Sequence, residues 1–204
     1  MNLGACRYLS RGPFQGTWFR ALHPKYLANP LATAHTRTHP TRFNPGTPPD
    51  PAFEILYLAE DAVVALFEVQ ALLGSAYAGA AFVANPAGGP WTTLDVQVNL
   101  QAVADLTRSS SLAIIDSSVQ ELTGDWRAYA LRHPARPRGG TNGSDVPTQR
   151  LGRQLVRVPG VEGFLSYSAR VATRRILMIF PGQLLPGSRL RYKDPVTGMQ
   201  MTIP

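Results

Sequence analysis

One nearly uncharged stretch constrains the fold of this chain more than any other feature. Between Asp61 and Asp95 the only Asp, Glu, Lys, Arg or His is Glu68. Residues 61–73 around it predict an apolar helix, most of whose circumference must be covered by other parts of the protein. A carboxylate in such a helix loses hydration, and a cation or several hydrogen-bond donors must offset that cost. Glu68 is therefore expected either to have a structural partner or to act on a substrate.

The chain has the length and composition of a single globular domain, residues 1–204. Its apolar content of 44% is ordinary, and its 18 glycines and 18 prolines disfavour an all-helical bundle. The only cysteine, Cys6, excludes an intrachain disulfide and fits a reducing cytosol. The N-terminus lacks the apolar core of a secretory signal, and no apolar stretch is long enough to span a membrane. We therefore expect a cytoplasmic protein without a membrane partner.

Strand and helix patterns follow one another without regular alternation. Strands are predicted at residues 17–22, 54–59, 91–100, 163–168 and 176–180, and helices at 61–73, 117–122 and 147–157. This order favours an α+β fold, with a compact mixed sheet core and flanking helices, over a doubly wound parallel sheet. We expect residues 23–53 to form a long loop, residues 133–146 a flexible basic loop and residues 1–13 a mobile N-terminus.

The net charge of +7 is distributed unevenly along the chain. Residues 1–126 hold seven basic and ten acidic side chains, whereas residues 127–204 hold thirteen basic and three acidic ones. Such a basic half is typical of proteins that bind nucleic acid. However, aromatic residues are not interleaved with the arginines, and there is no zinc-finger spacing, RNP motif or evident helix-turn-helix. The same charge would serve a pyrophosphate or an acidic protein partner, so a non-catalytic nucleic-acid-binding domain is the weaker alternative.

Three of the four histidines, His23, His35 and His39, fall in the predicted loop 23–53. No carboxylate or cysteine lies among them at the spacing of a metal site. They are therefore expected to be surface or loop-packing residues. No metal is expected in the chemistry of this protein.

Four side chains, Arg42, Tyr57, Glu68 and Ser168, lie in segments that together resemble a known family. These segments are Phe19–Arg20, Arg42–Gly46, Tyr57–Glu60, Ala65–Val69, Trp126, Thr148–Gln149 and Gly163–Arg170. In this order, across most of the chain, they resemble the RES-domain toxins, which are named for Arg, Glu and Ser and pair with Xre-type antitoxins in bacteria.

The resemblance implies an ADP-ribosyltransferase-like fold that binds NAD and breaks its nicotinamide–ribose bond. ADP-ribose would then pass to phosphate, to water or, in the alternative of a protein ADP-ribosyltransferase toxin, to a protein. The residue types fit this chemistry. Nicotinamide leaves as a neutral base while positive charge builds on the ribose, and a nearby carboxylate stabilises that charge. Glu68 is the candidate for this role.

The remaining candidates are assigned by the chemistry of their side chains. An arginine fork matches the oxygens of the pyrophosphate, with Arg42 as first choice and Arg20 as second. Tyr57 would stack on the nicotinamide or hydrogen-bond to the ribose. Ser168 would position either the nicotinamide amide or Glu68, and Ser166 is the alternative serine.

The same resemblance implies the binding partners. NAD is the expected substrate, inorganic phosphate is one acceptor, and a cognate Xre-type antitoxin would block the NAD cleft. Nucleic acid would be bound only through a complex with that antitoxin. A secreted effector with a separate immunity protein is the alternative biological setting.

Overall fold

The computed structural model describes residues 1–46, 52–74, 81–132 and 146–204. The strands are β1 (Arg11–Leu22), β2 (Leu56–Ala59), β3 (Leu72–Gly74), β4 (Phe82–Ala84), β5 (Thr92–Asp105), β6 (Gly163–Tyr167), β7 (Arg175–Ile179), β8 (Arg189–Lys193) and β9 (Gln200–Ile203). The α-helices are α1 (Ala62–Glu68), α2 (Ser109–Ile114), α3 (Val119–Thr123), α4 (Trp126–Arg132) and α5 (Pro147–Val156). Short 3-10 helices are η1 (Leu3–Tyr8), η2 (Pro24–Tyr26), η3 (Ala34–Arg37) and η4 (Pro181–Gln183).

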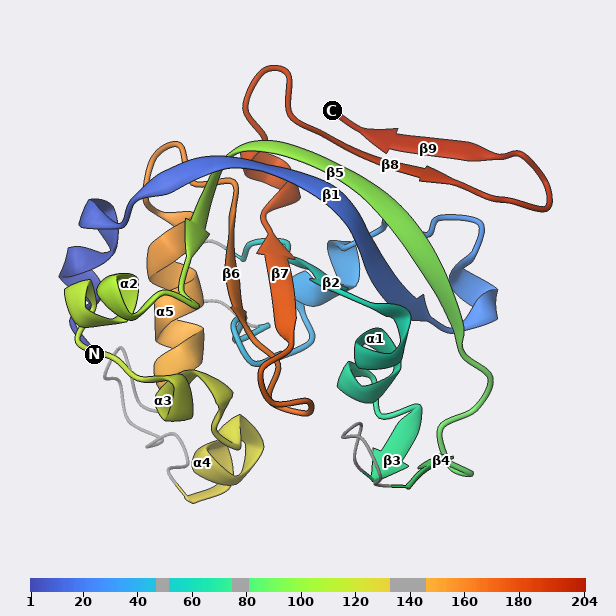
Figure 1. Ribbon diagram of the computed structural model, residues 1–204, viewed down its shortest axis with the longest axis horizontal. Helices are drawn as coiled ribbons and strands as arrows, with labels where there is room; N and C mark the ends of the chain where they lie inside the picture. Colours follow the sequence, from blue (N-terminus) through green and yellow to red (C-terminus); the bar gives the residue numbers. More distant parts are fainter. Residues whose placement is uncertain (47–51, 75–80, 133–145) are drawn as a thin grey trace.

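Two long strands, β1 and β5, form an antiparallel ribbon that arches over the rest of the molecule (Figure 1). The other edge of β5 pairs first with β8 and then, in parallel, with β6. The seven-stranded sheet has the order β1-β2-β7-β6-β5-β8-β9. The sheet also turns back on itself, because β1 pairs with β2 through Phe19 and Ala59. The result is a mixed sheet curved around a core.

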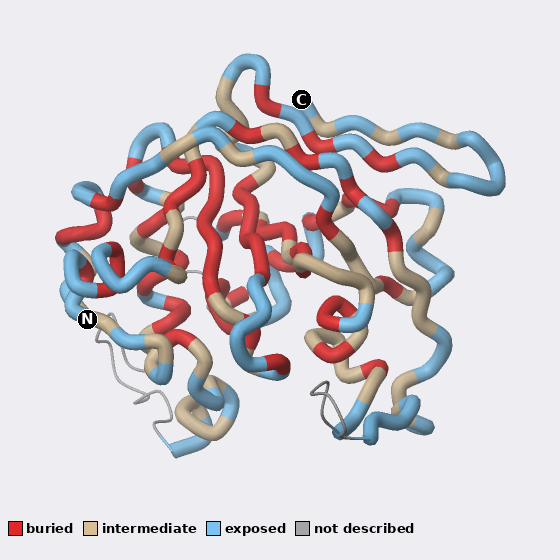
Figure 2. The backbone as a smooth tube through the Cα atoms, viewed as in Figure 1, coloured by how far each residue is buried: buried red, intermediate tan, exposed pale blue. Residues whose placement is uncertain are grey.

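The central strands β2, β6 and β7 are buried on both faces (Figure 2). One face packs against the inner side of the β1/β5/β8 ribbon, where alternate residues of β5 such as Val96 and Leu100 are fully buried. The other face packs against the helices, where Phe164 and Met178 share one hydrophobic cluster with Phe67 of α1 and with Leu151 and Leu155 of α5. Strands covered on both sides carry nearly continuous apolar runs, as these sequences do.

The predicted α+β class, with a mixed sheet and flanking helices, is confirmed. The predicted helix 61–73 is wrong in its second half, because α1 ends at Glu68 and residues 72–74 form β3. Gln70, with φ at 60°, adopts the left-handed conformation that ends a helix. The apolar run alone did not distinguish the last turn of a helix from a short strand. Helix α2 was not predicted.

Residues 1–13, for which the sequence predicts mobility, contain regular structure. Residues 3–8 form η1, and Cys6 and Leu9 are buried in the core beneath it. The Asn2 N–H donates to the carbonyl of Ile115 at 2.6 Å, which ties the start of the chain to α2. The predicted flexible loop 133–146 lies outside the described residues except for Val146, the buried N-cap of α5. In the described parts of the chain, no helix is long and apolar enough to cross a membrane.

Candidate active site

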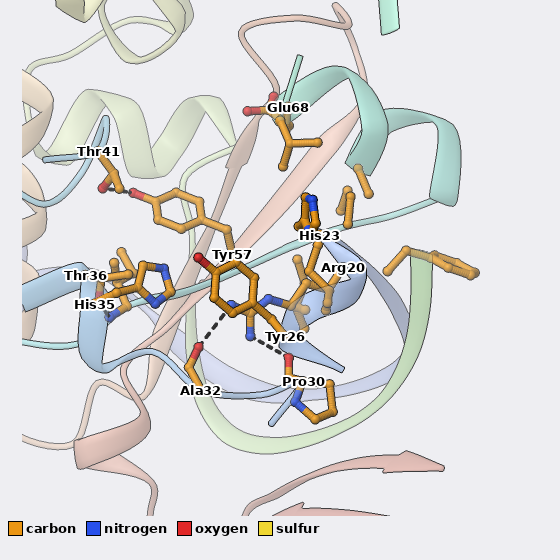
Figure 3. A pocket seen from close by; sticks show the side chains of 18 of the residues that line it. Arg20, His23, Tyr26, Pro30, Ala32, His35, Thr36, Thr41, Tyr57 and Glu68 are labelled. Atoms are coloured by element: carbon orange, nitrogen blue, oxygen red, sulfur yellow. Dashed lines mark hydrogen bonds between the residues drawn. The ribbon is translucent and has the colours of Figure 1, made fainter. Parts of the chain in front are cut away.

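Glu68 is the last residue of α1. The helix is opened by Asp61, whose carboxylate accepts a hydrogen bond from the Val64 N–H at 2.8 Å. Val64, Ala65 and Phe67 of this helix are buried in the core. Glu68 keeps 21% of its side chain exposed and lines a cavity (Figure 3). The carboxylate is thus fixed at its backbone yet accessible to a ligand.

Arg42 and Ser168 approach the two oxygens of this carboxylate from distant parts of the chain. Arg42 Nη2 lies 3.5 Å from Glu68 Oε2. Ser168 Oγ donates to Glu68 Oε1 at 2.5 Å. The three side chains named from the sequence as catalytic candidates therefore meet in one place. The hydroxyl thus orients one carboxylate oxygen through a short hydrogen bond, while the cation lies within salt-bridge distance of the other.

Ser168 lies in the turn after β6, and only 2% of its surface is exposed. Its Oγ accepts hydrogen bonds from the N–H groups of Arg170 and Val171 at 3.0 and 2.9 Å, which leaves its proton for Glu68. Ser168 is therefore placed to orient Glu68 rather than to touch a ligand. Ser166 is fully buried in β6, and its hydroxyl has no hydrogen-bond partner among the described residues.

The turn that carries Ser168 is tied to the start of the helix that carries Glu68. The Ser168 N–H donates to the carbonyl of Arg174 at 2.7 Å. Arg174 and Arg175 both pair with the carboxylate of Glu60, at 3.3 and 2.8 Å. Glu60 directly precedes the cap of α1, so these ion pairs fix the two halves of the site relative to each other.

Arg42 is only 8% exposed, and it does not belong to the lining of the cavity. Its Nε and Nη1 atoms have no hydrogen-bond partner in the described part of the chain. Buried guanidinium donors without acceptors are costly, so the charge depends on its neighbour Glu68. The structure thus brings Arg42 to the Glu68 carboxylate and not to the lining of the cavity, whereas the sequence made Arg42 the first choice for contact with a pyrophosphate.

The cavity has a volume of about 440 Å³, and Glu68 is part of its lining. Its walls come from the end of β1, the loop that follows it, β2 and α1. Aromatic and polar side chains not predicted as site residues, including Tyr26, Asn29, Thr41 and Trp91, contribute to the lining. Such a mainly apolar cavity with a few polar groups is typical of a small-molecule site.

Tyr57 presents its ring to this cavity from the middle of β2 (Figure 3). Its hydroxyl is already engaged, with Thr41 Oγ1 at 2.7 Å and with the N–H of Phe43 at 3.1 Å. Burial raises the pKa of Tyr57 to about 12. Tyr57 therefore remains a neutral phenol, and only its ring is available for contact with a ligand.

Arg20 lines the cavity and also holds the loop that forms its wall. Its Nη1 and Nη2 atoms donate to the carbonyls of Pro30 and Ala32 at 2.7 and 3.0 Å (Figure 3). Burial lowers the pKa of Arg20 to about 10, so the side chain stays charged at neutral pH. No carboxylate pairs with Arg20 among the described residues. The cavity therefore contains a cation that an anionic ligand group would complement.

The histidines expected to be surface or loop-packing residues lie around this cavity. His35 and His39 are exposed at its mouth, and burial, followed by the charges of Arg20 and His39, lowers the pKa of His35. His23 Nδ1 accepts from the Lys25 N–H at 3.2 Å, so His23 Nε2 carries the proton. No group of three His, Cys, Asp or Glu side chains suited to a metal occurs in the described residues.

Comparison with known proteins identifies the family. Residues 17–196 match the RES domain family. No curated protein sequence matches this chain. The fold is similar to that of a chain in the crystal structure of the M. tuberculosis MbcT–MbcA toxin–antitoxin complex, with a TM-score of 0.62, 16% sequence identity, and coverage of 94% of this chain and 88% of that chain. This likeness shows that the two chains share a fold, and the mixed sheet with flanking helices is the predicted α+β architecture. Because the family match spans most of its length, the chain belongs to the RES domain family.

Proposed function

We propose that this protein is an NAD-consuming toxin that breaks the bond between nicotinamide and ribose and passes ADP-ribose to phosphate or water. The observation that carries the proposal is the Glu68 carboxylate, held by Arg42 and Ser168 where it lines a cavity. The RES domain match and the toxin–antitoxin complex with a similar fold are consistent with it.

The chemistry requires a fixed negative charge beside the ribose. The bond from ribose C1″ to the pyridinium nitrogen breaks, and its electron pair leaves with nicotinamide, which becomes neutral. Positive charge then develops on C1″ and the ring oxygen. Glu68 stabilises that charge without giving up a proton, while Arg42 and Ser168 keep the carboxylate in place.

The acceptor completes the reaction from solution. A lone pair on a phosphate oxygen forms the new bond to C1″ and yields ADP-ribose 1″-phosphate. When water attacks instead, the products are ADP-ribose and a proton released to solvent. In both cases the protein needs no metal, because the leaving group is already activated by its own positive charge.

The cavity supplies complementary groups for the remainder of NAD. The Tyr57 ring offers a face on which the nicotinamide stacks. Arg20, a charged side chain in the lining, takes the role at the pyrophosphate that the sequence assigned first to Arg42. Arg42 instead serves by holding Glu68. His23 Nε2 adds a hydrogen-bond donor for a polar group of the substrate.

A toxin that consumes NAD in the cytoplasm requires an antidote. We propose a cognate antitoxin of the Xre type that covers the cavity, with nucleic acid reached only through that protein. The similar fold in the MbcT–MbcA toxin–antitoxin complex supports this partner. Coexpression with a cognate antitoxin should restore growth, and the purified complex should cleave NAD more slowly than the free protein.

Product analysis tests the activity. Purified protein is incubated with NAD, with and without phosphate, and the products are resolved by mass. Nicotinamide with ADP-ribose 1″-phosphate identifies phosphorolysis, and nicotinamide with ADP-ribose identifies hydrolysis. Intact NAD at high protein concentration, equal to that with Glu68→Gln, would overturn the proposal. Label from NAD on a cellular protein would instead identify protein ADP-ribosylation.

A further inference from the structure

We propose that helix α5 positions the catalytic carboxylate from a distance, because Thr148 and Gln149 fix the backbone that carries Arg42. This inference rests on the proposed function of Glu68. Neither Thr148 nor Gln149 lines the cavity, so both would act through Arg42 and not on the substrate.

Two buried side chains at the start of α5 bind consecutive carbonyls of the Arg42 segment. Thr148 Oγ1 donates to the carbonyl of Arg42 at 2.7 Å. Gln149 Nε2 donates to the carbonyl of Thr41 at 2.9 Å. These contacts span more than a hundred residues of sequence. Together they set both the position and the direction of the backbone at Arg42.

A third residue on the same side of α5 sets the distance between the helix and this segment. Gly152 packs so closely against Phe43 that an added Cβ would lie 1.9 Å from the Phe43 carbonyl oxygen. Residues 148, 149 and 152 are spaced to share one face of a helix. This face is therefore in direct contact with the backbone at both carbonyls and at Phe43.

Strand β2 holds the same segment from the cavity side. The Tyr57 hydroxyl accepts from the Phe43 N–H and shares a hydrogen bond with Thr41. The guanidinium of Arg42 lies 5.9 Å from the centre of the Phe43 ring, on the same segment, and its Nε and Nη1 have no hydrogen-bond partner among the described residues. The position of its guanidinium therefore depends on the backbone that α5 and Tyr57 hold.

The contact that depends on this backbone tolerates little movement. Arg42 Nη2 is 3.5 Å from Glu68 Oε2, at the outer limit of a hydrogen bond. A shift of the segment away from α1 would separate the pair and leave Glu68 free to rotate about its remaining bond to Ser168. Catalysis, which needs a fixed carboxylate, should suffer more than substrate binding.

Steady-state kinetics with NAD separates a loss of catalysis, seen in kcat, from a loss of substrate binding, seen in KM. Thr148→Val should lower kcat about tenfold with KM changed less than about twofold, and Thr148→Ser should restore most of kcat. Thr123→Val is the matched control, because Thr123 Oγ1 donates to a carbonyl within α3 at 2.8 Å. A raised KM with unchanged kcat for Thr148→Val, or an equal loss of kcat in the control, would overturn the proposal.

A double variant tests whether Thr148 acts through Arg42. In an Arg42→Ala background, Thr148→Val should cause no further loss of kcat, because the side chain that it positions is already gone. If the two losses multiply, Thr148 acts by a route that does not involve Arg42, and the proposal fails.

A spectroscopic measurement tests the positioning without reference to turnover. In protein labelled with ¹⁵N-arginine, the Arg42 Nε–H signal is assigned from its absence in Arg42→Lys. Thr148→Val should shift this signal, whereas Thr148→Ser and Thr123→Val should not. An unmoved signal would refute the positioning role even in an active enzyme. A shift in a protein that leaves NAD intact would refute the proposed function alone.

Discussion

The hydroxyl of Ser168 donates a 2.5 Å hydrogen bond to the carboxylate of Glu68 across 100 residues of sequence. Two backbone N–H groups donate to the same hydroxyl oxygen, so its proton has one direction in which to point. Arg42 holds the other carboxylate oxygen. The carboxylate is consequently oriented before any ligand arrives, which is the condition for electrostatic catalysis at low reorganisation cost.

Replacing this carboxylate should abolish most of the activity while leaving the fold intact. Glu68→Gln keeps the shape and one acceptor oxygen but removes the negative charge that, in the proposed mechanism, stabilises the ribose cation. We expect kcat for NAD cleavage to fall by roughly 10²–10³. Glu121→Gln is the control, since Glu121 also accepts from a serine hydroxyl, that of Ser117, at 2.9 Å. Equal activity of the two variants would remove Glu68 from the mechanism.

The two neighbouring serines should respond differently to loss of their hydroxyls. Ser168→Ala removes the donor that orients Glu68, and kcat should fall by about tenfold. Ser166→Ala removes a buried hydroxyl that has no partner among the described residues, so kcat and thermal stability should stay close to those of the wild type. Initial rates of NAD cleavage and thermal melting curves of both variants, compared with the wild type, test this difference. A larger kinetic loss at Ser166 would reverse the assignment.

The isolation of Glu68 in an apolar stretch was sufficient to single it out from the sequence. The burial pattern of β5, β6 and β7 was likewise readable from period-two and continuous apolar runs. The pairing of Glu68 with Arg42 and Ser168 needed the family resemblance, because contacts across tens of residues leave no periodicity. In the structure, Arg42 and Ser168 each contact the Glu68 carboxylate.

Other parts of the site were not accessible from the sequence. Arg20 binds the carbonyls of Pro30 and Ala32 in the loop after β1, and this part of the loop lines the cavity. Backbone acceptors have no sequence signature. The hydrogen bond of Thr148 could not be predicted from the sequence either, because its acceptor is the backbone carbonyl of Arg42. The three histidines in the long irregular loop were the only sequence signal for this part of the cavity. Their spacing does not fit a metal site, and it gives no indication that they line a cavity.

The hydroxyl and the ring of Tyr57 should have separable functions. Tyr57→Phe keeps the ring but loses both hydrogen bonds to residues 41–43, so kcat should fall about tenfold with little change in KM. Tyr57→Leu also removes the aromatic face, and KM for NAD should rise as well. Kinetics of the two variants against wild type test this division. A higher KM in Tyr57→Phe would mean that the hydroxyl binds substrate.

Burial of Tyr57 predicts a loss of stability at high pH. Its pKa is raised from 10 to about 12, so the folded state retains the phenol proton longer than the unfolded chain does. The resulting stabilisation is fully present below pH 10 and disappears as pH rises towards 12, with an upper value of about 2–3 kcal/mol. Urea unfolding between pH 9 and 12 should show a smaller decline for Tyr57→Phe. Parallel pH profiles would contradict the prediction.

The close approach of α5 to the Arg42 segment predicts that Gly152→Ala is damaging for a steric reason. The new methyl would meet the Phe43 carbonyl, a backbone group that cannot rotate away. Separating the helix from the segment should cost about 1–3 kcal/mol of stability, and kcat should fall because Arg42 moves away from Glu68. Gly182→Ala is the control, since a Cβ there meets nothing within 4 Å. Thermal unfolding and NAD turnover measure the two effects. If Gly152→Ala is as stable and as active as Gly182→Ala, α5 does not constrain the site.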